Sequence, residues 1–239
     1  MIDIHSHILP GIDDGAKTFE DSLAILRGLS EQGVTDIIAT PHFVYGSSYE
    51  STRANNRQLL SQLRQHLKKS NLDINVHLGN EIYIDRDIAT LLHHRTISSL
   101  ADSKYLLVEL PMSGEYQDYE DILLSLNYSG YQVILAHPER YHTVWKDFGI
   151  LEDLAEQGIL FQCNLGSIIG QYGKEPKKAI KKLAKAKLIF ACGTDIHHRR
   201  DYTEIAKAQK KLAHYYSEAE LNNILVNNPA KILADAKKK

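Results

Sequence analysis

Short apolar runs alternate with longer amphipathic segments along this chain. The runs are rich in leucine and β-branched residues and carry few charges, which is typical of strands that are covered on both faces. We therefore expect seven β-strands, in the runs Met1–Ile4, Val34–Thr40, Ile74–Leu78, Tyr105–Leu110, Tyr131–Ala136, Ile159–Asn164 and Leu188–Cys192.

The segments between the runs have the pattern of helices that bury one side. Phe19, Leu23 and Leu26 recur at helical spacing, and Gly33 is placed to end that helix. Pro176 suits the first turn of a later helix. The predicted helices are Thr18–Gln32, Ser51–Lys69, Tyr119–Ser129, Gly149–Gln157, Pro176–Lys187 and Thr203–Tyr216.

The regular alternation of strands and helices predicts an α/β fold with a parallel sheet and right-handed crossovers. Seven units favour a closed or nearly closed TIM-like barrel, and a doubly wound open sheet is the alternative. No linker or internal repeat interrupts the pattern, so we expect residues 1–239 to form one domain.

The composition excludes few functions, but it indicates a globular protein. Hydrophobic residues make up 43% and charged residues 24% of the 239 residues, as in ordinary globular proteins. A net charge of −2 gives no reason to expect nucleic acid as a partner. No signal peptide, membrane span or disulfide framework is evident, so we expect a cytoplasmic protein without stable membrane insertion.

Polar side chains with metal-binding chemistry stand at the carboxyl ends of most of the apolar runs. In a barrel these ends meet at one face, so the side chains are expected around a single cavity. A cavity with so many ligands would hold more than one metal ion, which is typical of hydrolytic enzymes. The candidate ligands are His5, His7, Asp14, His42, Glu81, Glu109, His137, Asp195 and His197.

Spacing supports several of these candidates. His5 and His7 are two residues apart, so both can point to the same side of a strand, and Asp195 and His197 repeat this spacing. Glu109 lies inside an otherwise apolar run, where a carboxylate is costly unless it binds a metal or forms a buried ion pair.

Two carboxylates require more comment. One of Asp13 and Asp14 is expected to form a turn or a helix entry, while the other reaches the cavity. Glu81 can bridge two cations, since each of its oxygens can face a different metal ion.

The motifs together resemble those of the polymerase-and-histidinol-phosphatase (PHP) superfamily, and most of all its bacterial capsule-locus branch of metal-dependent protein-tyrosine phosphatases. The resemblance runs from residue 1 to about residue 230. It is carried by His5-Ser-His7, Ile12-Asp-Asp-Gly15, Pro41-His42, Gly79-Asn-Glu81, Glu109-Leu-Pro111, His137-Pro-Glu-Arg-Tyr141 and Gly193-Thr-Asp-Ile-His197.

The resemblance implies a distorted seven-stranded barrel of PHP type with three divalent metal ions, usually Mn and sometimes Fe or Zn. It also implies a phosphotyrosine substrate on a cognate bacterial tyrosine kinase that controls capsule or exopolysaccharide synthesis. By position, one ion would be held by His5, His7, Glu81 and Asp195, a second by Glu81, Glu109 and His137, and a third by Asp14, His42 and His197.

The expected mechanism is in-line attack on phosphorus by a metal-bridging hydroxide. Glu81 is expected to be essential as the shared ligand. His42 or Asp195 could pass a proton to the leaving phenolate, but metal-bound water could do so too. Arg140 is expected to clamp the phosphate with its planar guanidinium, although a surface ion pair with Glu139 is the alternative.

Further positions are expected near the substrate. Arg200, or its neighbour Arg199, is a second candidate for the phosphate. Aromatic residues that could line the mouth, or simply pack in loops, are Phe43, Tyr45, Tyr49, Tyr116 and Tyr119. The lysines of Lys174–Lys187 are expected on a solvated helix face rather than on a docking patch.

Other activities are less consistent with the sequence. A cysteine-dependent phosphatase needs an arginine six positions after its nucleophile, but Ile169 follows Cys163 and His198 follows Cys192 at that spacing. Both cysteines are therefore expected in the core. A small-molecule phosphatase such as a histidinol-phosphate phosphatase, a nuclease and a metal-bearing regulatory module remain as alternatives.

Overall fold

A computed structural model describes residues 1–199 and 204–236 of the chain. Each of the seven apolar runs contains a strand, and every pair of neighbouring strands runs parallel, which confirms the predicted α/β class. The strands are β1 (Ile2–Asp3), β2 (Asp36–Ala39), β3 (His42–Phe43), β4 (Asn75–Leu78), β5 (Glu81–Tyr83), β6 (Tyr105–Glu109), β7 (Gln132–Ala136), β8 (Leu160–Asn164) and β9 (Ile189–Gly193).

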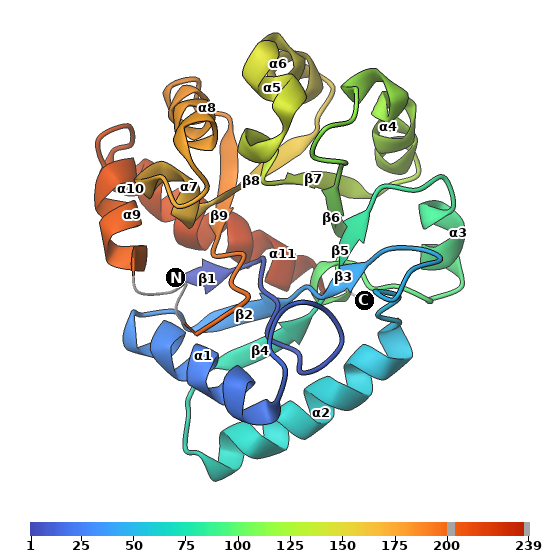
Figure 1. Ribbon diagram of the computed structural model, residues 1–239, viewed down its shortest axis with the longest axis vertical. Coiled ribbons are helices and arrows are strands. Elements are labelled where there is room, and N and C mark those ends of the chain that lie inside the picture. Colours follow the sequence, from blue (N-terminus) through green and yellow to red (C-terminus); the bar gives the residue numbers. More distant parts are fainter. Residues whose placement is uncertain (200–203, 237–239) are drawn as a thin grey trace.

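Helices surround the strands (Figure 1). Six of them overlap the predicted segments, and the others, which the sequence does not predict, lie in the connections or after the last strand. The helices are α1 (Phe19–Glu31), α2 (Arg53–Lys69), α3 (Ile88–His93), α4 (Glu120–Tyr128), α5 (His142–Lys146), α6 (Gly149–Glu156), α7 (Leu165–Ile169), α8 (Lys174–Lys185), α9 (Ile205–Leu212), α10 (Glu218–Asn222) and α11 (Asn228–Ala236), with 3₁₀ turns η1 (Leu100–Asp102), η2 (Tyr116–Asp118) and η3 (Pro138–Arg140) and a π-helical turn η5 (Asn223–Asn227).

Local chemistry explains where α1 begins and ends. The Thr18 hydroxyl accepts a hydrogen bond from the Asp21 amide, and the Asp21 carboxylate accepts one from the Thr18 amide, so both ends of this capping box are present. Gly33 follows the helix with φ of 84°, as expected of a residue that ends it. The predicted start of the last helix, Thr203, and the tail Lys237–Lys239 lie outside the described residues.

The strands pair in two parallel sheets and not in one closed barrel. One sheet has the order β1-β2-β4, and the other has the order β3-β5-β6-β7-β8-β9. The change of sheet occurs in two short gaps, between β2 and β3 at Thr40–Pro41 and between β4 and β5 at Gly79–Asn80. Pairing is interrupted at Pro41, whereas the Gly79 amide still donates to the Ala39 carbonyl at 2.8 Å. Proline has no amide hydrogen to donate to a strand ladder, so the pairing breaks at Pro41. The seven-stranded barrel is therefore not confirmed.

The two sheets nevertheless approach one another beyond β1 and β9. The Asp195 amide donates to the His5 carbonyl at 2.9 Å, and the His7 amide donates to the Ile196 carbonyl at 3.0 Å. Helix α11 packs against β1, β9 and η1, and Figure 1 shows it behind the strands. The residues that follow β1 and β9 are thus held side by side.

Alternation along the strands separates an outer layer from an inner one. In β6, Leu106 and Val108 pack in the cluster beneath the helices, whereas Leu107 packs in a second, smaller cluster with residues such as Ile134. Glu109, two residues after Leu107, therefore shares its inner face. The smaller cluster lies beneath the polar side chains at the strand ends. Its members are Ile2, Ile4, Ile38, Leu100, Leu107, Ile134, Ala136, Ala191 and Ile232.

Candidate metal centre

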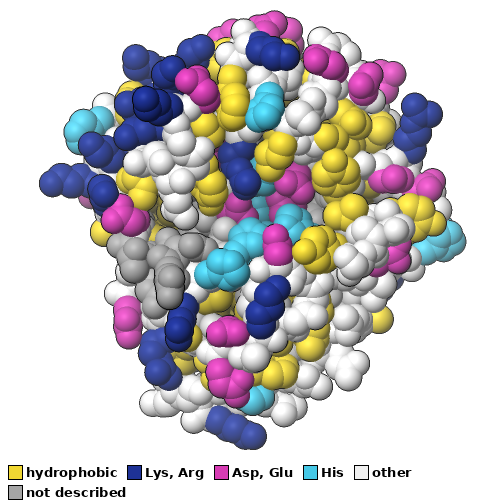
Figure 2. All heavy atoms as spheres, viewed as in Figure 1, with side chains coloured by type: hydrophobic (Ala, Val, Ile, Leu, Met, Phe, Trp, Pro, Cys, Tyr) yellow, Lys and Arg dark blue, Asp and Glu magenta, His cyan; other side chains and the backbone are white. Residues whose placement is uncertain are grey.

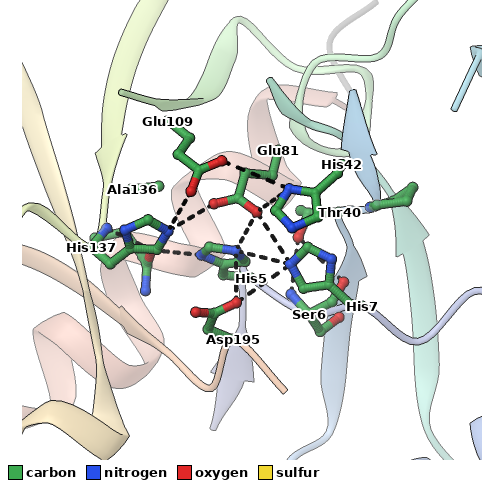
Figure 3. Close-up of polar contacts among 12 residues, drawn as sticks. His5, Ser6, His7, Thr40, His42, Glu81, Glu109, Ala136, His137 and Asp195 are labelled. Atoms are coloured by element: carbon green, nitrogen blue, oxygen red, sulfur yellow. Dashed lines mark hydrogen bonds and ion pairs between the residues drawn. The ribbon is translucent and has the colours of Figure 1, made fainter. Parts of the chain in front are cut away.

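Histidine and acidic side chains gather in a hollow at the centre of the molecule (Figure 2). Contacts of 3.8 Å or less connect all nine candidate ligands of the sequence analysis into one cluster. Figure 3 labels seven of them, whose side chains point toward one another from strands and from the segments that follow strands. The nine are His5, His7, Asp14, His42, Glu81, Glu109, His137, Asp195 and His197.

The most enclosed group consists of His5, His7, Glu81 and Asp195, which are all buried. His5 Nε2 lies 3.1 Å from Glu81 Oε2 and 3.3 Å from Asp195 Oδ1, and His7 Nε2 lies 3.2 and 3.4 Å from the same two oxygens. Donor atoms that bind one cation at about 2.1 Å are separated by roughly 3.0–3.4 Å at near-tetrahedral or octahedral angles. The spacing of this group therefore fits a cation at its centre.

An unsatisfied atom supports the same interpretation. Glu81 Oε2 is buried and accepts no hydrogen bond from the described residues, although one ring nitrogen each of His5, His7 and His42 lies 3.0–3.2 Å away. The His5 and His7 Nε2 atoms are also only 3.3 Å apart. Buried polar atoms normally have a partner. A cation would satisfy the oxygen and the two nitrogens together.

Two further groups adjoin the first. One contains His42, Glu81 and Glu109, and the other contains His7, Asp14, His42 and His197. Asp14 lies 3.5 Å from His42 Nε2 and 3.4 Å from His197 Nε2, and half of its side chain is exposed. This last group lies on the solvent side of the cluster.

One geometric group agrees fully with a metal site implied by the resemblance, and the other two groups differ in part from theirs. The buried group contains the same four residues as the first implied site. In the second, His42 stands in the group while His137 lies beside it, 2.9 Å from Glu81 Oε1 and 3.6 Å from Glu109 Oε1. In the third, His7 joins the expected residues. The assignment of ligands to individual ions stays a prediction.

Polar residues outside the cluster hold the first two histidines in place. The Gln162 carbonyl oxygen lies 2.7 Å from His5 Nδ1, and Asp13 Oδ2 lies 2.9 Å from His7 Nδ1. These bonds turn Nε2 of each ring toward the centre, as outer partners of metal-binding histidines do. Asp13 is thus the aspartate with the structural role. Gln162 was missed, although a buried amide in an apolar strand was a usable signal.

Close backbone contacts bring the Asp13–Asp14 loop onto the first strand. A Cβ atom at Gly15 would lie only 2.1 Å from the His7 carbonyl oxygen, so no other residue fits here. The Ala16 amide donates to that same oxygen at 3.0 Å. The glycine therefore lets the loop approach closely enough for Asp13 and Asp14 to reach the cluster.

Burial and neighbouring charges shift the acid–base properties of the cluster. Burial and the adjacent Glu81 carboxylate raise the pKa of Glu109 to about 8. Burial opposes the charged form of His5, but the Glu81 and Asp195 carboxylates outweigh it and raise its pKa to about 9. The pKa of Glu81 itself lies well below its usual range, because His5 and His42 outweigh its burial. Histidines compensate the charge of these carboxylates here, and bound cations would supply the same compensation.

Arg140 borders the cluster from η3. Its Nη1 donates to Asp195 Oδ2 at 3.0 Å, and its guanidinium carbon lies 4.7 Å from the centre of the Tyr172 ring. The alternative ion pair with Glu139 is wrong. The Glu139 carboxylate is buried and accepts hydrogen bonds from the Asn164 amide and the Ser167 hydroxyl. The other candidate for the phosphate, Arg200, lies outside the described residues.

The aromatic candidates for the mouth differ in their environment. Phe43 is 2% exposed and packs in the core under the helices, because it faces away from the cluster when its neighbour His42 faces toward it. Tyr116 is also buried. Tyr49 stacks on His42 with ring centres 6.0 Å apart, and Tyr45 is 55% exposed. Only part of this set can border the hollow.

Cys163 and Cys192 are both buried, as expected of core residues. Burial, followed by the charge of Glu139, raises the pKa of each thiol. A thiol that resists ionisation is a poor nucleophile, so neither cysteine can serve a phosphatase reaction of the cysteine type.

The cavities outside the hollow contain fewer convergent titratable side chains. Two surface grooves of about 610 and 740 Å³ lie along α2 and β4, and none of the nine residues lines them. A cavity of about 400 Å³ adjoins the cluster at His197, with Lys17 and Arg199 in its lining. Although the grooves are larger, the site is assigned to the hollow with the nine side chains, because its titratable groups converge.

Among residues 1–199 and 204–236, no helix combines the length and the apolar character needed to cross a membrane. The location of the protein in the cell stays a prediction.

Comparisons with known proteins agree on one family. A family model described as "Capsular polysaccharide synthesis, CpsB/CapC" matches residues 1–234. The tyrosine-protein phosphatase YwqE of Bacillus subtilis is 37% identical over 198 residues, which are 83% of this chain and 78% of the relative. The tyrosine-protein phosphatase CpsB of Streptococcus pneumoniae is 30% identical over 98% of this chain and 99% of the relative.

Solved structures add the architecture. A crystal structure reported for YwqE from Bacillus subtilis and CpsB from Streptococcus pneumoniae, described as unique metal-dependent tyrosine phosphatases, aligns with a TM-score of 0.92 and 33% identity, covering 98% of this chain and 95% of the other. The lactonase Lmo2620 from Listeria monocytogenes aligns with a TM-score of 0.55 at 11% identity, which shows a shared fold alone. With a family model that spans nearly its whole length, the chain belongs to the CpsB/CapC family of capsular polysaccharide synthesis proteins.

Proposed function

We propose that this protein is a metal-dependent protein-tyrosine phosphatase that acts, as one domain of residues 1–239, on a bacterial tyrosine kinase controlling capsule or exopolysaccharide synthesis. The observation that carries the proposal is the convergence of nine metal-binding side chains in one hollow. Relatives that share the family are named tyrosine-protein phosphatases and described as metal-dependent.

The hollow would hold three divalent cations, with Mn²⁺ as the first choice and Fe or Zn as alternatives. Histidine nitrogens and carboxylate oxygens suit all three metals, so the ligand set alone does not select one. When bound, the cations would acidify water to provide a nucleophile and would neutralise the phosphoryl oxygens. Glu81 lies within 3.2 Å of histidines from three strand ends and would join neighbouring ions.

Arg140 is placed to hold the phosphate. An arginine has five N–H donors, so the bond to Asp195 leaves others for phosphoryl oxygens. The Tyr172 ring and the Asp195 carboxylate restrict the guanidinium at the border of the cluster. This fixed orientation would lower the entropy cost of binding the phosphate.

The protein groups considered as proton donors are already engaged. His42 directs Nδ1 toward Glu81 and Nε2 toward Asp14, at 3.0 and 3.5 Å. Asp195 uses Oδ1 toward His5 and His7 and Oδ2 toward Arg140 and Asn164. Every side-chain nitrogen and oxygen of these two residues thus already has a neighbouring partner atom within 3.5 Å. Water is therefore the donor that we favour.

Hydrolysis assays test the proposal directly. The protein is stripped of metal, refilled with Mn²⁺ and assayed on a phosphotyrosine peptide, a phosphoserine peptide and histidinol phosphate, each with and without chelator. Chelator-sensitive release from phosphotyrosine alone is the expected result. Faster hydrolysis of histidinol phosphate would contradict the proposed phosphotyrosine substrate but would be consistent with the proposed metal centre. Inactivity with every metal would contradict both the substrate and the metal centre.

A further inference from the structure

Helix α8 concentrates positive charge in a molecule whose net charge is −2. The segment Lys174–Lys187 contains seven lysines and one glutamate. The helix buries Pro176, Ala179, Ile180, Leu183 and Ala184, which leaves the lysines on the other side. Figure 2 shows Lys and Arg side chains gathered at the upper left, over α8 and its neighbours.

Four of these lysines form a straight row. Lys174, Lys178, Lys181 and Lys185 follow one another at intervals of four, three and four residues, so they share one helix face. At 1.5 Å per residue the row spans about 16 Å. An extended peptide of about five residues has the same length.

The row makes a single polar contact with the described residues. Lys174, Lys181 and Lys185 make no polar or ring contact with the described residues, and Lys178 bonds only to the exposed Glu175 at 2.7 Å. An exposed ion pair of this kind contributes little and can exchange its partner. The positive charge of the row is therefore available to an external group.

The row begins at the edge of the metal centre. Helix α8 packs against η3, the turn that carries Arg140. Tyr172, which stacks on the Arg140 guanidinium, precedes Lys174 by two residues. A polypeptide that places a phosphotyrosine in the hollow therefore has the first lysine of the row close beside it.

The sequence pattern alone predicts a solvated helix face here rather than a docking patch. Because the row begins beside Arg140, we propose instead that the lysine row of α8 (Lys174, Lys178, Lys181 and Lys185) binds acidic residues that flank the phosphotyrosine in the protein substrate. This inference rests on the phosphatase function proposed above and adds the class of sequence that the enzyme prefers. Lysines carry a compact charge on a flexible stem, so the row selects negative charge without demanding one fixed side-chain geometry.

An anionic membrane is a poorer match for the same surface. Helices that lie on membranes combine basic residues with exposed apolar side chains that insert between lipids. Among the described residues, the exposed large hydrophobic side chains are Tyr45 and Tyr128, and neither belongs to α8. The row therefore has the positive charge that an anionic membrane would attract. Helix α8 has no exposed large apolar side chain that could insert into the lipids.

The test compares phosphotyrosine peptides that differ only in their flanks. One has aspartates on both sides of the phosphotyrosine, and the other has asparagines at the same positions. With Mn²⁺-loaded wild-type protein at low salt, kcat/KM should be about five- to tenfold higher for the acidic peptide. This preference should vanish at about 0.5 M NaCl, because salt screens exposed charges.

The variant K174Q/K181Q should reduce the preference to about twofold or less. The matched control is K68Q/K69Q, which removes two exposed lysine charges from α2 and should leave the preference unchanged. Every rate is divided by the rate on free phosphotyrosine, so a loss of metal or of folded protein cancels.

The outcomes separate this inference from the function on which it rests. Wild-type protein that hydrolyses neither peptide nor free phosphotyrosine would overturn the phosphatase proposal. Equal rates on both peptides, or a preference that survives in K174Q/K181Q, would overturn only the role of the row. Lysine-dependent binding to phosphatidylglycerol vesicles without any peptide preference would assign the row to a membrane and also overturn it.

Discussion

The candidate metal centre is built by two regions of the molecule that hold their side chains differently. In the first region, residues 1–83, the strands are two to four residues long and are interrupted at Pro41 and Gly79. In the second region, β6 to β9, each strand has five residues and pairs along its length. The first region nevertheless contributes five of the nine candidate ligands.

Buried side chains replace the missing ladder bonds in the first region. The Ser6 amide donates to the Thr40 hydroxyl, and the Ser6 hydroxyl donates to the Ile38 carbonyl, both at 2.9 Å. Asn80 donates to the carbonyls of Pro41 and Ser51. In the second region, sheet pairing and apolar packing hold the strands in place instead. An interrupted strand can therefore present several ligands, provided that polar groups hold the chain at the interruption.

Removal of Glu81 should have the largest effect on activity, because this side chain contacts ligands from both regions. It starts β5 in the first region and lies 2.9 Å from His137 of the second. Glu81→Ala should lower kcat/KM on phosphotyrosine by at least about 10³-fold, since it deletes the oxygen closest to three histidines. Steady-state kinetics with excess Mn²⁺ measures this. Near-normal turnover would contradict a shared ligand.

The polar groups at these interruptions can be tested through stability. Asn80 is buried, and its side chain also accepts a hydrogen bond from the Ser98 amide at 2.9 Å. Asn80→Ala leaves several buried groups without partners and should lower the free energy of unfolding by about 3 kcal/mol, or Tm by roughly 6–12 °C.

The matched control in the second region is Asn127→Ala. This side chain accepts one hydrogen bond, from the Val133 amide, in a half-buried position. Its loss should cost about 1 kcal/mol. Thermal unfolding that shows equal costs for the two variants would argue against a special dependence of the first region on polar bonds.

A smaller effect is expected from the residues that orient the histidines. Asp13→Ala in the first region and Gln162→Ala in the second should each weaken Mn²⁺ binding by about 10- to 100-fold. Isothermal titration of metal-stripped protein provides the affinities. If one variant binds Mn²⁺ as tightly as wild type, the histidine of that region is oriented by something other than this bond.

The smallest effect should come from the first region but away from these interruptions. Thr18→Ala removes the cap of α1 and should cost about 1 kcal/mol, or a fall in Tm of roughly 2–4 °C. Mn²⁺ affinity should not change. Weaker metal binding in this variant would show that α1 positions the Asp13–Asp14 loop.

The two regions also differ in how well the sequence predicts them. Charged residues inside or just after apolar runs were easy to identify, because burying Glu109 or His137 needs a reason. Neutral polar residues such as Gln162 and Asn80 gave a weaker signal, since an amide in a strand or turn can have many roles. Their importance depends on partners from distant segments.

Topology was predicted only in part for a related reason. The apolar runs predicted the parallel strands, but pairing depends on how the backbone continues after each run. The predicted strands end just before Pro41 and Gly79, yet nothing local shows that β3 and β5 resume pairing in a second sheet. Short helices such as α7 and α10 have too few residues to show a periodic pattern.

The hydrogen bond from the Asp195 amide to the His5 carbonyl has a consequence for biosynthesis. These residues are 190 positions apart, so a ribosome must add most of the chain before they can meet. Until then Asp195 cannot join the carboxylates and imidazoles of the first strands, and these groups stay exposed to water. Contacts of such long range form late and slowly. An ion held by this group would therefore be captured from the metals available when translation ends, rather than while the chain emerges.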